Sequence, residues 1–264
     1  MFGKKKEPEY TELTGLLGVG ADYHVYHMTK KDYLTAWLIG AAVGIVVIFA
    51  FFRSLLFTLA GAVIAAMLAP GYYCEFRKKQ RLNQLRLQFK DLLESLTASY
   101  SAGKNTVDAF QDAKGDMESI YGSDADIVDE VQIICTGLSN NINIEQLLLD
   151  FAKRCGLSDV LSFANVFEVC NRQGSDLKRI VSETRDILND KIEIEMEIQT
   201  TVAANKNEIN IMCVMPFVII AMMGTMGQAS ITANTPLNVL VKLIAIFMFV
   251  IAYKLGRKIT DIKV

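Results

Sequence analysis

The chain alternates long charge-free stretches with a strongly charged middle. No Asp, Glu, Lys or Arg occurs between Asp32 and Arg53, between Arg53 and Glu75, or between Glu208 and Lys242. A helix of about 20 apolar residues is long enough to cross the ~30 Å hydrocarbon core of a bilayer. The pattern therefore predicts membrane-spanning helices on both sides of a water-exposed domain.

The charge-free stretches divide into four predicted transmembrane helices, at residues 33–52, 54–73, 209–227 and 237–255. They give five regions: an N-terminal tail (1–32), a first transmembrane hairpin (33–73), a helical domain (74–208), a second hairpin (209–255) and a C-terminal tail (256–264). Small residues in the first hairpin would allow its two helices to approach closely: Gly40, Gly44 and Gly61.

Basic residues predict how these spans are oriented. Arg77, Lys78, Lys79 and Arg81 follow the second span, and Lys254, Arg257 and Lys258 close the fourth. Cytoplasmic loops are enriched in Lys and Arg. We therefore expect a multi-pass membrane protein with both termini and the middle domain in the cytoplasm.

The middle domain has the periodicity of six helices, with apolar residues at three- and four-residue steps. Asn105 and Ser123 are expected to cap the second and third helices. The fifth helix, after Ser158, is apolar around most of its circumference, which predicts a position at the centre of the bundle. Residues 191–198 (KIEIEMEI) alternate like a strand, but no partner strand is predicted nearby, so we expect helix. The predicted fold is all-α: a cytoplasmic six-helix bundle flanked by two transmembrane hairpins, four transmembrane helices in all.

Charge and cysteine usage narrow the functional classes. Residues 75–208 carry 16 Lys/Arg and 23 Asp/Glu, a net charge of −7, whereas the whole chain has −2. A negative domain argues against nucleic acid as a partner, because phosphate contacts need a basic face. The basic remainder lies beside the spans, where it would attract anionic lipid of the bilayer. The five cysteines form no CxxC motif, which is typical of a reducing cytosol.

Motifs for catalysis and cofactors are missing from the sequence. Gly103-Lys104 lacks the flanking residues of a phosphate-binding loop, and there is no dinucleotide fingerprint or nucleophile elbow. The two histidines, His24 and His27, could share a helix face, but no cysteine lies near enough to complete a four-ligand zinc site. We therefore expect a protein that is not an enzyme and that has neither cofactor nor metal.

Acidic residues cluster at the start of the middle domain. Eight lie within 23 positions, opposed there only by Lys114. This acidic stretch is open to three interpretations: a solvated face, a docking surface for a basic partner, or a divalent-ion site without the loop spacing of a calcium hand. The candidate partner-contact residues are Asp108, Asp112, Asp116, Glu118, Asp124 and Asp126.

Lys242 is a charged residue in the interior of a predicted span, about six positions into the fourth. A lysine there can extend its ammonium group to the outer headgroups. Alternatively, it contacts a polar group of a transported or assembled partner.

Three segments carry a resemblance to a known family. They are RLNQLRLQFKDLLESLTASYSAGKNTVDAF (81–110), GLSNNINIEQLLLDFAKRCG (137–156) and NVFEVCNRQGSDLKRIVSETRDIL (165–188). Their order between two hairpins resembles the F-type platform proteins of type II secretion and type IV pilus machines. It is most similar to the single-domain members of the tight-adherence (Tad/Flp) pilus systems. The residues that carry the resemblance include Gly103, Gly137, Gln173, Gly174 and Leu177.

The resemblance implies a role at the cytoplasmic membrane. Such platforms couple a cytosolic assembly ATPase to the insertion of pilin or pseudopilin subunits into a filament. A single helical domain implies self-association or pairing with a second platform protein. The alternative that the sequence leaves open is a small polytopic transporter or membrane sensor, which would use Lys242 and the glycine-bearing spans.

Overall fold

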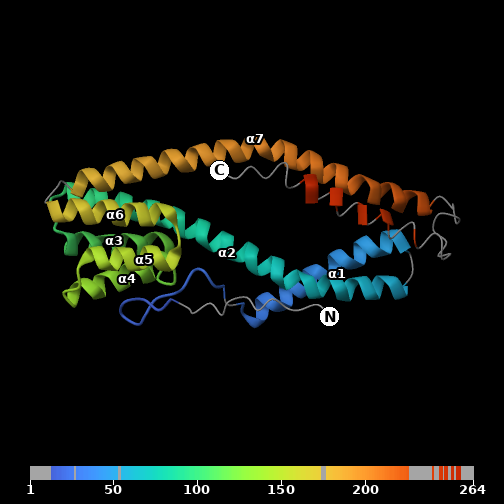
Figure 1. Cartoon of the computed structure of the whole chain (residues 1–264), viewed down its shortest axis with the longest axis horizontal. Coiled ribbons are helices and arrows are strands. Elements are labelled where there is room, and N and C mark those ends of the chain that lie inside the picture. The colour runs from blue at the N-terminus through green and yellow to red at the C-terminus, as the bar shows by residue number, and fades with distance from the viewer. Residues whose placement is uncertain are drawn as a thin grey trace, which may run out of the picture. The chain divides into compact units, whose positions relative to one another are not determined.

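The computed structural model describes residues 13–26, 28–52, 55–173 and 177–225, together with scattered positions between 240 and 256. The regular secondary structure of these residues is helical, without strands, so the predicted all-α class is confirmed (Figure 1). The chain divides into two compact units. We call Met1–His27 with Glu75–Lys191 the central unit, and Met28–Cys74 with Ile192–Val264 the second unit.

Four shorter helices of the central unit follow one another along the chain: α3 (Thr106–Tyr121), α4 (Asp126–Ser139), α5 (Ile144–Cys155) and α6 (Ser158–Gln173) (Figure 1). Each has an apolar stripe at helical spacing, and consecutive helices pack against one another. Phenylalanine rings join them to the preceding helix. Phe89 lies 5.6 Å from Phe163 and 6.2 Å from Phe151, measured between ring centroids.

Two long helices each belong to both units. Helix α2 (Leu55–Ser101) passes from the second unit into the central one at residues 74 and 75, and α7 (Leu177–Thr225) leaves the central unit after Lys191. Residues 191–198 are helical, as predicted, and lie within α7. Gly103 (φ 78°) follows the end of α2 in a left-handed conformation that a side chain would disfavour.

The predicted helix caps are right in one case and wrong in another. Asn105 is the N-cap of α3, and its side-chain oxygen accepts a hydrogen bond from the Asp108 amide (2.9 Å). Helix α4 begins two residues later than expected, after Ala125, which has no side-chain capping bond, so Ser123 does not cap it. Acidic residues in the first turn of α4 stabilise its N-terminus instead, because their negative charge is attracted to the positive end of the helix dipole.

The predicted central position of α6 is wrong. Val160, Phe163 and Phe167 are buried, but Leu161, Val166 and Val169 are 42%, 44% and 52% exposed. The exposed face also carries Ser162 and Asn165, small polar residues that interrupt the apolar surface. The mostly apolar composition of α6 therefore does not bury it on all sides, because neighbouring helices contact only part of its circumference.

Helix α1 (Lys30–Phe52) and the first part of α2 pack closely within the second unit. A Cβ atom on Gly40 would lie 2.9 Å from the Ala65 carbonyl oxygen, and one on Gly44 would lie 2.8 Å from the Ala65 Cβ. Gly61 meets Ile48 in the same way. The prediction that these three glycines permit close helix approach is confirmed.

One helix segment within the described residues is long and apolar enough to cross a membrane, judged by length and composition. It is Thr58–Ser101, whose most apolar part has a mean hydropathy of 1.3 and is 17% buried. The second predicted span coincides with its beginning. The full set of four spans and their orientation stay predictions. Lys242 lies outside the described residues.

Candidate functional site

The acidic stretch lies on α3, on the loop that follows it and on the first turn of α4. Asp108 belongs to the start of α3, where its carboxylate accepts a hydrogen bond from the Asn105 side-chain amide (2.8 Å). Asp126 belongs to the first turn of α4. Two of the six candidate contact residues therefore support helix N-termini as well as adding negative charge.

Two contacts of the acidic stretch show that Lys114 is not the only cation opposing it. Asp126 forms a two-pronged ion pair with Arg81 of α2, at 2.5 and 2.9 Å. Asp112 pairs with Lys104, and Glu118 pairs with Lys114 at 3.3 Å. Asp116 accepts a hydrogen bond from Ser95 of α2. The sequence analysis missed two of these cations because Arg81 and Lys104 lie outside the stretch along the chain.

The loop between α3 and α4 carries one of the six candidate contact residues. Asp124 is exposed there, and Asp129 is exposed one turn into α4. Asp112 has a lowered pKa and Lys104 a raised one, in both cases chiefly because of the hydrogen bond between them. The part of the stretch that can still meet a basic partner directly is therefore centred on Asp124, with Glu118 beside it in sequence.

The divalent-ion interpretation gains no support from the geometry. Within the described parts of the chain, no three His, Cys, Asp or Glu side chains are grouped so that they could hold a metal ion. His24 lies 3.0 Å from the Asp22 carboxylate, and His27 lies outside the described residues.

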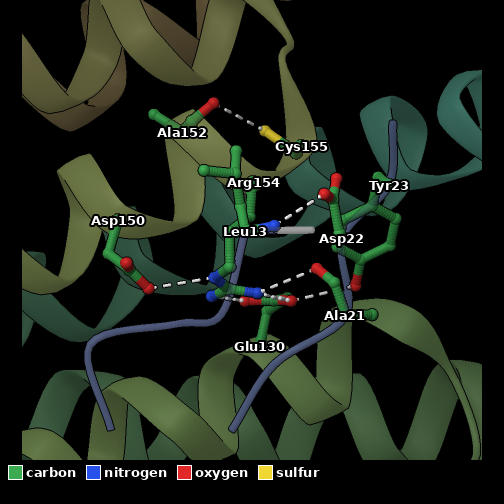
Figure 2. Close-up of polar contacts among 9 residues, drawn as sticks. All are labelled: Leu13, Ala21, Asp22, Tyr23, Glu130, Asp150, Ala152, Arg154 and Cys155. Carbon is green, nitrogen blue, oxygen red and sulfur yellow. Dashed lines mark hydrogen bonds and ion pairs between the residues drawn. The ribbon is translucent and has the colours of Figure 1, made fainter. Parts of the chain in front are cut away.

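A second charged cluster, absent from the sequence prediction, lies inside the central unit (Figure 2). Arg154 of α5 and Glu130 of α4 have side chains that are 2% and 1% exposed. The guanidinium donates from Nη1 and Nη2 to the two Glu130 oxygens (2.6 and 2.5 Å), and from Nε to Asp150 (2.9 Å). The three residues form what we call the Arg154 cluster.

The N-terminal segment of residues 13–26, which we call the strap, lies against this cluster (Figure 2). The Tyr23 amide donates to the Arg154 carbonyl (3.1 Å), and Arg154 Nη1 donates to the Ala21 carbonyl (3.2 Å). The Tyr23 hydroxyl donates to Glu130 (3.0 Å), and the Arg81 guanidinium lies 4.7 Å from the centre of the Tyr23 ring. The predicted N-terminal tail thus folds onto the helical domain through the strap.

Burial and neighbouring charges shift the pKa values of Tyr23 and Arg154. The pKa of Tyr23 is raised, first by burial and then by the negative charges of Glu130 and Asp126. Burial works against the charge of Arg154, but its hydrogen bonds and ion pairs with Glu130 and Asp150 outweigh it and raise the pKa of the guanidinium. Arg154 is therefore firmly cationic, and a pair this well shielded from water is an anchor and not a reactive site.

Two glycines give the strap room to dock. A Cβ atom on Gly20 (φ 133°) would lie 2.6 Å from Arg154 Nη1. Gly156 (φ 66°) ends α5 in the left-handed conformation, and a Cβ there would lie 2.6 Å from His24 Nε2. The same glycine that stops α5 therefore also admits the strap.

The sequence does contain a signal for the Arg154 cluster. Arg154 lies seven residues after Leu147 and three after Phe151, so it falls on the apolar stripe of α5. Glu130 likewise lies three residues after Ile127 on the buried face of α4. Opposite charges on the apolar stripes of consecutive helices indicate a buried ion pair, because each would otherwise be buried alone.

The family-motif residues take structural positions. Gly137 of α4 faces Leu147 of α5, and a Cβ on it would lie 2.7 Å from Leu147 Cδ1. Glu145 accepts a hydrogen bond from Asn171 of α6 (2.7 Å). These two contacts therefore join three consecutive helices, α4 to α5 and α5 to α6.

The third motif falls at the break between two helices. Gln173 is the last residue of α6 and Leu177 the first of α7, whereas Gly174 lies outside the described residues.

Comparisons of the chain with protein-family models, with curated proteins and with solved structures give no match.

Proposed function

We propose that the chain is a platform protein of a type IV (Tad/Flp) pilus or type II secretion machine in a prokaryotic cytoplasmic membrane. In this role it has no catalytic activity of its own. It couples a cytosolic assembly ATPase to the insertion of pilin or pseudopilin subunits, with a second platform protein or another copy of itself as neighbour. The central unit is the cytoplasmic six-helix domain, and the apolar helices lie in the bilayer as two hairpins.

The observation that carries the proposal is the sharing of two helices between the units. Both α2 and α7 have an apolar part in the second unit and a charged part in the central unit, with no break between them. The hydrogen-bond ladder of a helix makes it stiff along its axis, although Pro70 removes one bond of that ladder in α2. A displacement of the charged part is therefore passed on to the apolar part, as a force-coupling platform requires.

The acidic side chains around Asp124 provide a surface for the ATPase in this proposal. Complementary charge guides and orients protein association more than it adds affinity. Asp126 forms a two-pronged ion pair with Arg81 of α2, so reversing its charge would disturb the fold as well as the surface. Asp124 and Glu118 are the better positions to test.

The test is capture of the purified hexameric ATPase by the full-length chain in detergent. Reversing both charges (Asp124→Lys with Glu118→Lys) should weaken capture by about tenfold or more at low salt, as expected for steering charges. Asp190→Lys, an exposed acidic position on α7, is the matched control and should leave capture unchanged.

Two results would separate the contact from the role. Equal capture by the reversed and control variants would eliminate the acidic contact. No capture by the unmodified chain, together with normal filament assembly in cells that lack it, would refute the platform role. Solute flux into proteoliposomes that contain this chain alone would favour the transporter instead.

A further inference from the structure

We propose that the strap is a latch. It detaches from the helices of the central unit as a single segment while α4 and α5 stay folded, and its release frees the chain that leads into α1. The inference does not depend on the platform role. It rests on what the strap buries, on which partners its release would leave behind, and on where the strap leads along the chain.

The strap buries little apolar surface for its length. Among residues 13–26, all of which the structure describes, Tyr23 is the one buried hydrophobic side chain. Leu13, Leu16 and Val19 stay 42%, 54% and 63% exposed while the strap is docked. Segments with little buried apolar area open at a lower free energy than the helices they cover. The strap is therefore expected to detach before the helices unfold.

Release of the strap leaves no buried charge without a partner. Arg154 loses the Ala21 carbonyl but keeps Glu130 and Asp150. Glu130 loses the Tyr23 hydroxyl but keeps both bonds to Arg154. Arg81 loses the Tyr23 ring but keeps Asp126. Each of these three ionic groups thus has a second partner on the helices, and water reaches them when the strap leaves. The usual penalty for breaking a buried polar contact is largely absent here.

The strap also holds itself together as a unit. Asp22 accepts hydrogen bonds from the Leu13 amide (2.9 Å) and from the His24 amide (2.8 Å), which link its two ends. A turn joins Gly18 to Gly15 through a bond between the Gly18 amide and the Gly15 carbonyl (2.7 Å). These bonds lie within the strap, so they survive its release, and the strap opens in one step instead of fraying residue by residue.

The consequence of opening concerns α1. Only residues 27–29 separate the strap from Lys30, the first residue of α1. While Tyr23 is docked, residues 24–29 are all of the chain between it and the first residue of α1. When the strap leaves, the freed chain lengthens by the residues that had been docked. The latch therefore sets the length of free chain that precedes α1.

Two strap glycines give a matched pair of variants. Gly20 and Gly18 both have positive φ, so alanine strains the backbone at either position. Only at Gly20 would the added methyl group meet Arg154, because nothing lies within 4 Å of a Cβ on Gly18. Neither substitution lies in a helix. Any difference between the two variants therefore reports on docking of the strap.

The experiment is hydrogen–deuterium exchange with mass spectrometry on the full-length protein in detergent. In the unmodified chain the peptide that contains Tyr23 should exchange measurably faster than the peptides of α4 and α5. Gly20→Ala should speed exchange of the Tyr23 peptide by about tenfold or more relative to Gly18→Ala, since backbone strain and a steric clash together exceed about 1 kcal/mol. Exchange in α4 and α5 should be unchanged in both variants.

Three results would overturn the latch. The first is equal exchange rates for the strap and α5 in the unmodified chain, which would mean that they open together. The second is faster exchange of α4 and α5 in Gly20→Ala, and the third is the same effect of Gly18→Ala and Gly20→Ala on the strap. Tyr23→Phe, which removes only the hydroxyl, gives an independent check: it should speed strap exchange and spare the helices, and a rate unchanged from the parent chain would also contradict the latch.

Discussion

The central unit contains two kinds of ion pair with similar chemistry and different surroundings. Lys104 and Asp112 pair at the surface, with side chains 44% and 40% exposed, whereas Arg154 and Glu130 pair where 2% and 1% of each side chain is exposed. Water and salt screen the first pair, and measured values for such pairs are about 0–1 kcal/mol. The second pair was desolvated on folding, so losing either partner leaves a bare buried charge. Burial, and not the identity of the charges, decides which pair the fold depends on.

The largest effect is expected when the buried pair is broken from one side. Arg154→Met leaves Glu130 buried without its cation and should lower the free energy of unfolding by about 3–5 kcal/mol. Circular dichroism during chemical denaturation of the full-length protein in detergent measures this change. Combining Arg154→Met with Glu130→Leu should recover most of the loss, because the fully buried carboxylate is then gone and Asp150, whose side chain is 15% exposed, still reaches water.

The surface pair supplies the control. Lys104→Met should change the same free energy far less than Arg154→Met does, and 1 M salt should remove even that difference. Similar losses from Arg154→Met and Lys104→Met would contradict the distinction drawn between the two pairs.

A smaller effect on stability is expected where the buried contact is apolar and carries no charge. Gly137→Ala places a methyl group against Leu147 and should cost about 1–3 kcal/mol through overpacking. Gly115 lies within α3 with open space around its Cα, so Gly115→Ala should stabilise the protein by about 0.5–1 kcal/mol. Thermal unfolding of the two variants measures the contrast. A destabilised Gly115→Ala protein would show that the α3 surface is covered by something else.

The smallest effect is expected from the link between the strap and the buried pair. Tyr23→Phe removes one hydrogen bond to Glu130 and should cost about 0.5–1.5 kcal/mol at neutral pH. Because the folded-state pKa of Tyr23 is raised, its contribution is fully present below the unfolded-state pKa of about 10 and is lost as pH rises above that value. Denaturation at pH 8 and pH 11 should show the difference between the parent and Tyr23→Phe proteins shrinking at the higher pH. A difference that grows with pH would reverse the assigned direction of the shift.

The sequence predicts the helical class and much of the central unit because its signals there are local. Asn105 caps α3 through its own side chain, and the strand-like residues 191–198 lie in a helix because no partner strand is available. The close approach of α1 and α2 also follows from glycines that can be recognised in the sequence.

The failures concern contacts between residues that are far apart along the chain. Whether α6 is covered on all sides depends on how many neighbours reach it, which its composition does not encode. The partners of Asp112 and Asp126 lie on or just after α2, and the docking of Tyr23 onto Glu130 joins positions 107 residues apart. The Arg154 cluster could have been inferred from charges on apolar stripes, but the strap could not, because its one buried side chain has no periodic pattern around it.

The two stretches that build the central unit have a practical consequence. Residues 13–26 and 75–191 fold together although the whole of α1 and the part of α2 before Glu75 intervene between them. A fragment that starts at Glu75 would expose the Arg154 cluster and lack Tyr23. Crystallisation or screening of this domain without lipid therefore calls for a fusion in which a flexible linker replaces residues 27–74, or for addition of residues 13–26 as a synthetic peptide.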